Sequence, residues 1–374
     1  MTMQSVSGLL ILLISVSVAW ATELTPSQRK AVDEAVITQM QQQHLVGLSI
    51  GIIQDGAVAY TAGYGLSDRE AGTPVTADTM YRWASISKPL TAVAAMQLVD
   101  ANKLDLDADV RTLVPEFPDP GSPVTTRQLL GHLGGIVHYR NGPVVPTQCA
   151  YAEAHPHADV VKALDTFKAS PLVSDPGEAF NYSTHGYILA SAVVQRASEQ
   201  PFAWQVKSRI ADPLGMQSLQ PDYQWVDIPH RAKGYRKLDG MIVASDDSDV
   251  SWKLGGGGWI STIGDLSRFA AGMMGDTLLP ADARVAMWTP QRTADGTATG
   301  YGLGFGVSGA GANLKVSHTG AQAKTRTIMS IWPANRSGVV MMTNSEWVDR
   351  GKVMAAITKA MAIDRADVNV VETR

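Results

Sequence analysis

The stretch Ser-Ile-Ser-Lys at residues 85–88 follows an apolar segment, 80–84, and opens a helical run that continues through residues 89–98. If the helix begins at or just after Ser85, the side chains of Ser85 and Lys88 lie on one face within a single turn. A neutral lysine there can deprotonate the serine hydroxyl, and both burial and the helix dipole favour the neutral amine. The Ser85 backbone N–H, at a helix N-terminus, is free to bind a developing oxyanion.

A second copy of the pattern, Ser-Gln-Arg-Lys at residues 27–30, opens a polar helix and is interpreted as a capped helix end. Any single Ser-x-x-Lys has this alternative explanation. The apolar setting of Ser85 and the partners found further along the chain therefore decide its interpretation.

Strand patterns occur near both ends of the chain. Residues 46–53 and 58–64 flank Asp55-Gly56, which predicts a hairpin. Gly-Leu-Ser-Ile-Gly at 47–51 matches the nucleophile elbow of α/β-hydrolases, but a hairpin rather than a helix follows, so we exclude it. Further strands are expected at 303–307, 314–318, 327–332 and 339–343, and helices at 26–43, 183–198 and 349–362.

This order predicts an α+β fold, in which an antiparallel sheet built from both terminal regions is flanked by helices. A helical subdomain, about residues 103–250, is expected to be inserted into it, and residues 22–374 to form one domain. Four glycines at 255–258 precede another helix. No Gly-Lys-Ser/Thr follows them, so we expect close backbone packing rather than a phosphate site.

Two further motifs supply partners for Ser85. Tyr182 begins Tyr-Ser-Thr at a loop-to-helix junction, and a tyrosine beside a lysine ammonium can lose its proton more readily and act as a base. The segment His-Thr-Gly at 318–320 lies on an expected strand, where a glycine allows close approach of substrate, and the Ala321 N–H would be the second oxyanion donor. Taken singly, these motifs are also explained as a helix-entry aromatic and a strand end. A chance match to all three motifs in this order is much rarer than a chance match to any one of them.

Together the three motifs resemble those of the penicillin-recognising serine hydrolases. The resemblance spans about residues 26–362 and is greatest to the class C β-lactamase-related branch, especially the mitochondrial lactamase-like serine proteases and β-lactamase-like carboxylesterases. It implies a β-lactamase/transpeptidase-like fold with an inserted all-α subdomain and an active site at the junction. It also implies an acyl-enzyme on Ser85, with Lys88 and Tyr182 sharing proton transfer. The residues implied to bind substrate are Thr184, His318, Thr319 and Gly320.

Two positions depart from that family pattern. Thr184 stands where asparagine is usual, and its single hydroxyl is a poorer partner for a substrate amide. His318 stands where lactamases carry a lysine, and a histidine near pH 7 is mostly neutral. Both changes favour small esters or peptides over β-lactams as substrates. A true β-lactamase, a D-Ala carboxypeptidase and a non-catalytic penicillin- or peptidoglycan-binding protein remain alternatives.

Composition limits the other classes of function. The 374 residues carry a net charge of −4 with both signs scattered, which does not indicate nucleic-acid binding.

His155-Pro-His157 has no third ligand placed near it, and no metal or cofactor is expected. His132 and His138 are expected to be structural loop residues, and His185 is a candidate for lining the site. We expect a small-molecule or peptide substrate.

The N-terminus resembles a secretory signal peptide. Residues 8–20 are apolar and uncharged, and Ala19-Trp-Ala21 fits the small-x-small rule, which predicts cleavage after Ala21. Residues 1–7 contain no lysine or arginine, so an uncleaved N-terminal anchor is the alternative. The sequence thus predicts a periplasmic or secreted protein.

Overall fold

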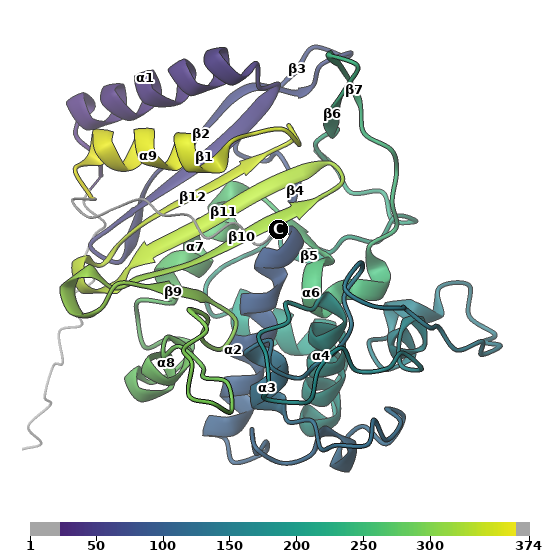
Figure 1. Cartoon of the computed structure of the whole chain (residues 1–374). Helices are drawn as coiled ribbons and strands as arrows, with labels where there is room; N and C mark the ends of the chain where they lie inside the picture. Colours follow the sequence, from purple (N-terminus) through teal and green to yellow (C-terminus); the bar gives the residue numbers. More distant parts are fainter. Residues whose placement is uncertain (1–22, 364–374) are drawn as a thin grey trace, which may run out of the picture.

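The computed structural model describes residues 23–363, and their largest feature is a seven-stranded antiparallel sheet with helices on both faces (Figure 1). Strands from the two ends of the chain meet in the middle of this sheet, where Ile50 pairs with Met341. The predicted sheet of N- and C-terminal segments is therefore confirmed. In spatial order the strands are β3 (Thr73–Pro74), β2 (Ala57–Asp68), β1 (Gly47–Gln54), β12 (Ser337–Thr343), β11 (Thr325–Trp332), β10 (Lys315–Gln322) and β9 (Gly306–Ser308).

The first two long strands form the predicted hairpin. Its turn residues Asp55 and Gly56 have φ angles of 54° and 79°, the left-handed conformation that a two-residue type I′ turn requires. Residues 47–51 lie inside β1, so the exclusion of a nucleophile elbow is confirmed.

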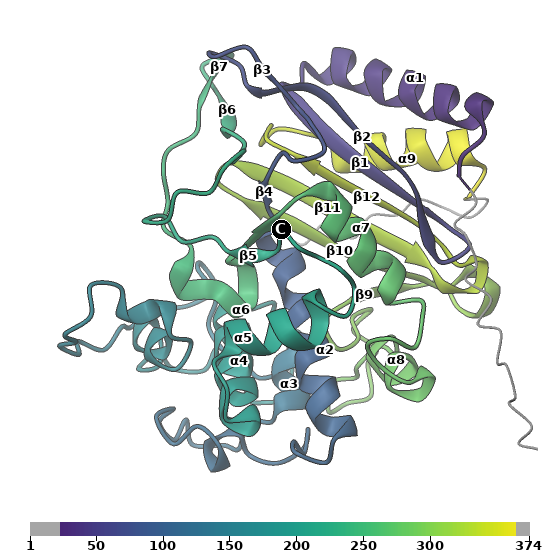
Figure 2. The ribbon, with the colours of Figure 1, turned by 180° about the vertical axis from the view of Figure 1, so that it is seen from behind.

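Helices cover both faces of the sheet (Figures 1 and 2). On one face Val32 and Val36 of α1 pack in a buried cluster with Val353 and Ile357 of α9. α7 covers the other face, and the remaining helices form the layer below. The helices are α1 (Pro26–Gln43), α2 (Ser87–Asp100), α3 (Thr126–Leu130), α4 (Thr184–Ser198), α5 (Phe202–Val206), α6 (Leu254–Gly257), α7 (Ile263–Gly272), α8 (Ala281–Met287) and α9 (Arg350–Met361).

Two buried helices, α2 and α4, form the centre of the lower layer. Every residue of α2 from Ser87 to Leu98 is buried, as expected for a helix that is apolar on all sides. The few polar side chains of α2, Lys88 among them, are therefore enclosed with it. Such polar groups must find partners inside the protein or lose their charge.

The interval 103–250 contains α3, α4 and α5, and it carries short strands in addition. β5 (Gln220–Pro221) pairs with β8 (Trp259–Ser261), which also pairs with β4 (Tyr81–Arg82). A separate hairpin of β6 (Tyr235–Leu238) and β7 (Met241–Ala244) lies at the surface, where Met241 is 63% exposed. These strands lack an alternating buried face, which is why the sequence pattern did not predict them.

One local expectation differs from the structure and another is confirmed. The strand expected at 303–307 is reduced to β9, because Gly304 has a φ of 86° and Gly302 N–H donates to the Phe305 carbonyl in a tight turn. Three of the four glycines of the run at 255–258 lie in the helical turn α6. A Cβ on Gly256 would lie 2.6 Å from Thr184 Cγ2, so the expected close packing is confirmed, against α4.

Within residues 23–363, no helix has both the length and the apolar character needed to cross a membrane. The predicted signal peptide, residues 1–21, lies outside the described part of the chain.

Candidate active site

Ser85 lies at the junction between the sheet and the helical layer. It occupies a 3₁₀ turn, η1 (Ala84–Ile86), that leads directly into α2, so the helix begins just after the serine, as predicted. The preceding residue, Ala84, has a φ of 49°, a left-handed conformation that is strained for a residue with a Cβ. Thr327 of β11 donates to the Trp83 carbonyl at 2.9 Å and holds this turn against the sheet.

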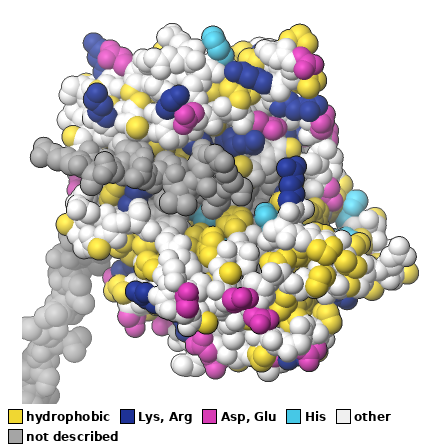
Figure 3. Space-filling view, viewed as in Figure 1, with side chains coloured by type: hydrophobic (Ala, Val, Ile, Leu, Met, Phe, Trp, Pro, Cys, Tyr) yellow, Lys and Arg dark blue, Asp and Glu magenta, His cyan; other side chains and the backbone are white. Residues whose placement is uncertain are grey.

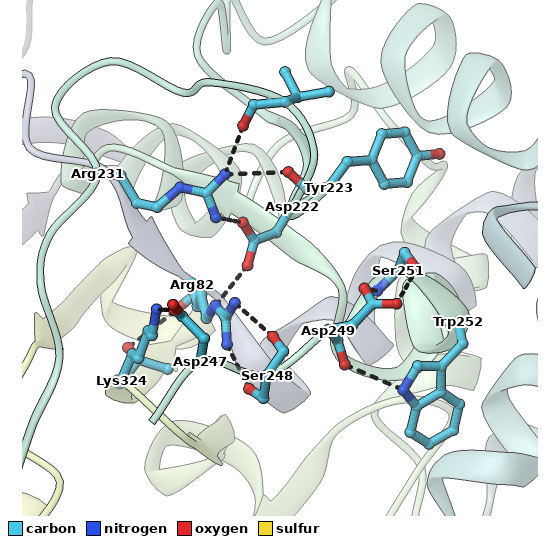
Figure 4. Close-up of polar contacts among 12 residues, drawn as sticks. Arg82, Asp222, Tyr223, Arg231, Asp247, Ser248, Asp249, Ser251, Trp252 and Lys324 are labelled. Carbon is cyan, nitrogen blue, oxygen red and sulfur yellow. Dashed lines mark hydrogen bonds and ion pairs between the residues drawn. The ribbon is translucent and has the colours of Figure 1, made fainter. Parts of the chain in front are cut away.

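A buried ion cluster fixes the chain just before the nucleophile (Figure 4). Arg82 Nε lies 2.5 Å from Asp222 Oδ2, and Arg231 contacts the other oxygen of the same carboxylate. The Arg82 guanidinium also donates to the Ser248 hydroxyl and carbonyl at 3.0 and 2.9 Å. Because Arg82 and Asp222 are both buried, this geometry restrains β4 and, through it, the turn that carries Ser85.

The side-chain nitrogen of Lys88 lies at the centre of the site. Its Nζ is 3.1 Å from Ser85 Oγ, 3.1 Å from Thr184 Oγ1 and 2.9 Å from the Gly256 carbonyl oxygen. A neutral amine has two N–H donors and one lone pair. It can therefore donate to Thr184 and Gly256 while it accepts the Ser85 O–H, which satisfies all three contacts and directs the serine proton to the amine.

The surroundings of Lys88 favour that neutral form. Burial lowers the pKa of Lys88 well below its usual value, and the positive charge of Lys253 lowers it further. Its hydrogen-bond partners in the described chain are uncharged oxygens. The amine that the sequence required as a base is thus electrostatically disfavoured as an ammonium.

Tyr182 lies beside the same pair. Lys88 Nζ is 4.8 Å from the centre of the Tyr182 ring, and the phenol lies close enough to the Ser85 hydroxyl for that group to affect its pKa. Burial raises the pKa of Tyr182, and Ser85 lowers it by a smaller amount. The expectation that a neighbouring ammonium eases ionisation of this phenol is not met, since the amine is disfavoured as a cation. The proton belongs on the phenol in the resting site.

Two histidines hold the Tyr-Ser-Thr segment in place. The Ser183 N–H donates to His132 Nδ1 at 3.1 Å, and the Thr184 N–H donates to His138 Nδ1 at 3.2 Å. Both backbone donors belong to the N-terminus of α4, where N–H groups lack partners inside the helix. His132 and His138 were expected as structural loop residues. The structure shows that they position Tyr182 and Thr184.

His318 is neutral and fully engaged. Its Nδ1 lies 2.7 Å from the Thr319 carbonyl, which can only accept, so Nδ1 carries the proton. Nε2 then accepts the Tyr301 O–H at 2.9 Å. Burial lowers the pKa of His318 to about 3. The imidazole thus presents neither a charge nor a spare N–H to a substrate, unlike the lysine that it replaces in lactamases.

Gly320 is required by the sheet itself. A Cβ on Gly320 would lie 2.1 Å from Thr327 Oγ1 and 2.5 Å from the Trp83 carbonyl oxygen. The glycine therefore lets β10 approach the turn that carries Ser85, whereas the sequence had suggested that it admits substrate.

Gly320→Ala is expected to destabilise the protein by about 1–3 kcal/mol, because the added methyl forces β10 and the Ser85 turn apart. It should also lower kcat by separating the two oxyanion donors. Urea unfolding and ester hydrolysis would measure both effects. Gly275→Ala is the control, since its Cβ would lie 3.9 Å from the nearest atom. Equal stability of the two variants would contradict the prediction.

The Ala321 N–H faces the open edge of β10. Val307 N–H donates to the Gly300 carbonyl, away from β10, so the neighbouring residue Gly306 directs its polar groups toward its partner Ser317. Backbone groups alternate in direction along a strand, and Ala321 therefore faces the same edge as Ser317, beyond the point where β9 ends. The predicted second oxyanion donor is free of the sheet ladder.

Histidines near the site are held neutral by burial, which makes stability depend on pH. Burial lowers the pKa of His138 and His318 to about 3 and that of His185 to about 4, all below the unfolded value of about 6.5. From pH 6.5 downward to these values the unfolded state binds more protons, so stability falls as pH falls. Thermal unfolding between pH 8 and 5 should show a decline that begins near pH 6.5. The exposed His44→Asn variant should retain it, and a flat curve would contradict the prediction.

Other histidines lie outside the reacting group. His185 donates to the Val137 carbonyl at 2.9 Å and stacks on Phe167, so it supports the loop behind α4. His155 stacks on Trp225 with ring centres 3.6 Å apart. In residues 23–363 no three His, Cys, Asp or Glu side chains are grouped so that they could hold a metal ion.

Three side chains close to the nucleophile were not predicted. Burial raises the pKa of Tyr139 and the nearby Thr184 side chain lowers it by a smaller amount, and Lys253 Nζ lies 5.7 Å from the centre of the Tyr139 ring. Gln322, the last residue of β10, lies next to the oxyanion donor Ala321. One signal was available: Lys253 stands two residues before the glycine run, where close backbone packing was expected.

Comparison with known proteins agrees with this arrangement. The family model described as "Beta-lactamase" matches residues 32–359. The human mitochondrial serine β-lactamase-like protein LACTB is 30% identical over 322 residues, which cover 65% of this chain and 59% of LACTB. Esterase EstB of Burkholderia gladioli is 35% identical over 193 residues, 49% of either chain.

The chain thus spans 59% of the length of LACTB and 49% of that of EstB. Among solved structures, EstCE1, a hydrolase with promiscuous acyltransferase activity, superposes with a TM-score of 0.74 at 20% identity, over 89% of this chain and 98% of EstCE1, which shows a shared fold. The family model covers most of the chain and the fold agrees with it. The chain therefore belongs to the β-lactamase family.

Proposed function

We propose that this protein is a serine hydrolase that cleaves ester or amide bonds through an acyl-enzyme on Ser85. The observation that supports this most directly is the position of Lys88 Nζ, 3.1 Å from Ser85 Oγ, in surroundings that disfavour its charged form. A serine paired with a neutral base, beside two free backbone N–H groups, is the arrangement that acyl transfer requires.

The first half of the reaction forms the acyl-enzyme. The substrate carbonyl oxygen binds between the N–H groups of Ser85 and Ala321. Lys88 takes the Ser85 proton as Oγ attacks the carbonyl carbon. The leaving group then departs with a proton from the Tyr182 phenol, which regains one from the Lys88 ammonium. In the second half water attacks the acyl carbon and gives a proton to the same pair. The bond between Ser85 Oγ and the acyl carbon then breaks, the pair returns the proton to Oγ, and the acid leaves.

The site favours esters and amides that lack a carboxylate on the leaving-group side. His318, at the start of the third motif, is neutral and bonded through both nitrogens. Hydrophobic side chains gather on the helical half of the face seen in Figure 3, and Tyr139, Val145 and Phe180 are between 36% and 45% exposed. EstB is named as an esterase, which supports the same preference. We propose small esters or peptides as substrates ahead of β-lactams.

A labelling and turnover experiment tests the proposal. The purified protein is incubated with a fluorophosphonate probe, and peptide mass spectrometry locates the adduct, which is expected on Ser85. Hydrolysis of p-nitrophenyl butyrate is compared with that of nitrocefin and a D-Ala-D-Ala peptide, and faster relative turnover of the ester is expected. Absence of any adduct and any turnover would reject the hydrolase. Stable acylation by penicillin without turnover would instead indicate a non-catalytic penicillin-binding protein.

We also propose that the chain is exported to the periplasm or beyond. The apolar run at 8–20 and the small residues at 19 and 21 support this. Intact-mass measurement of protein from the periplasmic fraction tests it, and a mass that begins at Thr22 is expected. A full-length protein in the membrane fraction would support the uncleaved anchor.

A further inference from the structure

We infer that Lys253, together with Gln322, selects substrates whose acyl portion carries a carboxylate. The inference rests on the proposed function and adds a substrate class to it. Lys253 belongs to the helical side of the site, at the end of η6 (Ser251–Lys253), and Gln322 to the strand side, at the end of β10.

The two side chains converge close to the nucleophile. The point where a Cβ on Gly257 would stand lies 3.4 Å from Gln322 Oε1 and 3.7 Å from Lys253 Cδ. The same point lies 3.7 Å from the carbonyl carbon of Ala84, the residue before Ser85. The absence of a side chain at Gly257 thus leaves the lysine stem and the glutamine amide facing one space beside the Ser85 turn.

Lys253 is a cation without a carboxylate of its own. Its Nζ lies over the rings of Tyr139 and Trp252, 5.7 Å from each ring centre. It forms no ion pair with a carboxylate of the described residues. The nearby Asp249 carboxylate accepts from the N–H and hydroxyl of Ser251 instead. An ammonium that contacts two aromatic rings and no carboxylate can bind an anion without first breaking a salt bridge.

The side-chain amide of Gln322 independently indicates that a hydrogen-bond acceptor binds here. Its Nε2 is buried and has no hydrogen-bond acceptor among the described residues, although buried polar atoms are nearly always paired. A substrate carboxylate or amide carbonyl on this side would accept that hydrogen bond. The ammonium and the unpaired amide therefore favour the same kind of group.

The positions of Lys253 and Gln322 relative to the leaving group decide which part of the substrate these two side chains recognise. Tyr182, the proposed proton donor to the leaving group, lies toward His318, with ring centres 6.5 Å apart. Gln322 lies at the other end of the exposed edge of β10, past the oxyanion donor Ala321. Lys253 and Gln322 therefore face the acyl portion, and the neutral His318 end faces the leaving group.

Charge balance around Lys253 agrees with this role. Burial and, to a smaller extent, the positive charge of Arg82 lower the pKa of Lys253 to about 8 against the opposing effect of Asp249, so the amine is mostly charged at pH 7. Lys253 in turn lowers the pKa of Lys88. A bound substrate anion would place a negative charge beside this cation, whose closest described contacts are the rings of Tyr139 and Trp252.

A matched pair of esters tests the inference. Mono-4-nitrophenyl adipate has an anionic acyl chain, and methyl 4-nitrophenyl adipate is its neutral counterpart. The ratio of their kcat/KM values should exceed about 10 for the wild type and fall at least about tenfold in Lys253→Met. Lys253→Arg should retain the preference, and Lys253→Glu should reverse it. Glutarate and pimelate pairs locate the best chain length.

Lys237→Met is the matched control, because Lys237 is an exposed lysine that also lies over an aromatic ring, that of Trp347. It should leave the ratio unchanged. Equal rates for the two esters in the wild type, or a preference that survives Lys253→Met, would overturn the inference while the hydrolase assignment stands. Hydrolysis of neither ester would reject the proposed function, and the inference with it. If Lys253→Met fails to fold, Lys253→Gln, which keeps a polar end without the charge, provides the same test, and a preference that survives in it overturns the inference.

Discussion

Ser85→Ala is expected to lower kcat for p-nitrophenyl butyrate on the order of 10⁴-fold or more and to abolish fluorophosphonate labelling. The reason is that no other hydroxyl shares the position of Ser85 Oγ, 3.1 Å from Lys88 Nζ and next to its own backbone oxyanion donor. Thr184 Oγ1 is equally close to the amine, but its residue lies on α4 rather than at the start of α2. Steady-state hydrolysis and labelling of the purified variant would measure the loss.

Ser87→Ala is the control for that experiment. Ser87 lies two residues further on, is buried, and its hydroxyl has no hydrogen-bond partner in the described chain. Removing it should therefore leave activity and stability nearly unchanged. Full turnover by Ser85→Ala, or equal losses in both variants, would show that Ser85 is not the nucleophile.

The parts of the site that the sequence predicted depend on short-range periodicity. Ser85 and Lys88 are one helical turn apart, so their proximity follows from the helix alone. Tyr182 could be predicted because a loop-to-helix junction with a serine cap is a local pattern, and Ser183 does accept from the Gly186 N–H. The antiparallel sheet followed from strand patterns at both ends of the chain.

The parts that were not predicted depend on contacts between distant segments. Nothing near His132 in the sequence indicates that its ring accepts the Ser183 N–H. The carbonyl of Gly256 becomes a partner of Lys88 only because the glycine turn α6 packs against α4. The neutral state of His318 likewise follows from burial and from Tyr301, not from its own neighbours in the chain.

Lys88→Met is expected to lower kcat by about 10²–10⁴-fold, the usual contribution of a general base, and to change how stability depends on pH. The methionine has a similar length and no charge, so it fits a fully buried position without creating a void. Activity would be measured as for Ser85→Ala. Labelling of Lys88→Met should be slow but detectable, because the serine and the oxyanion donors remain.

The pH dependence follows from the lowered pKa of Lys88. Between its folded pKa and the unfolded value of about 10.4, the unfolded chain binds more protons than the folded chain. Wild-type stability should therefore rise with pH across this window, and that contribution should be absent from Lys88→Met. The Tm difference between wild type and variant should shift in favour of the wild type as pH is raised from 7 to 9.5.

The slope of that difference, rather than its size, is the decisive quantity. The variant also loses the donors to Thr184 Oγ1 and the Gly256 carbonyl, which costs stability at every pH in this range. Of the groups that the substitution removes, only the desolvated amine changes its proton occupancy between folded and unfolded chains, so it is what makes the difference depend on pH. A difference that stays constant from pH 7 to 9.5 would mean that Lys88 keeps its proton in the folded protein. It could not then take the proton of Ser85, and the proposed base would be wrong even if the nucleophile were right.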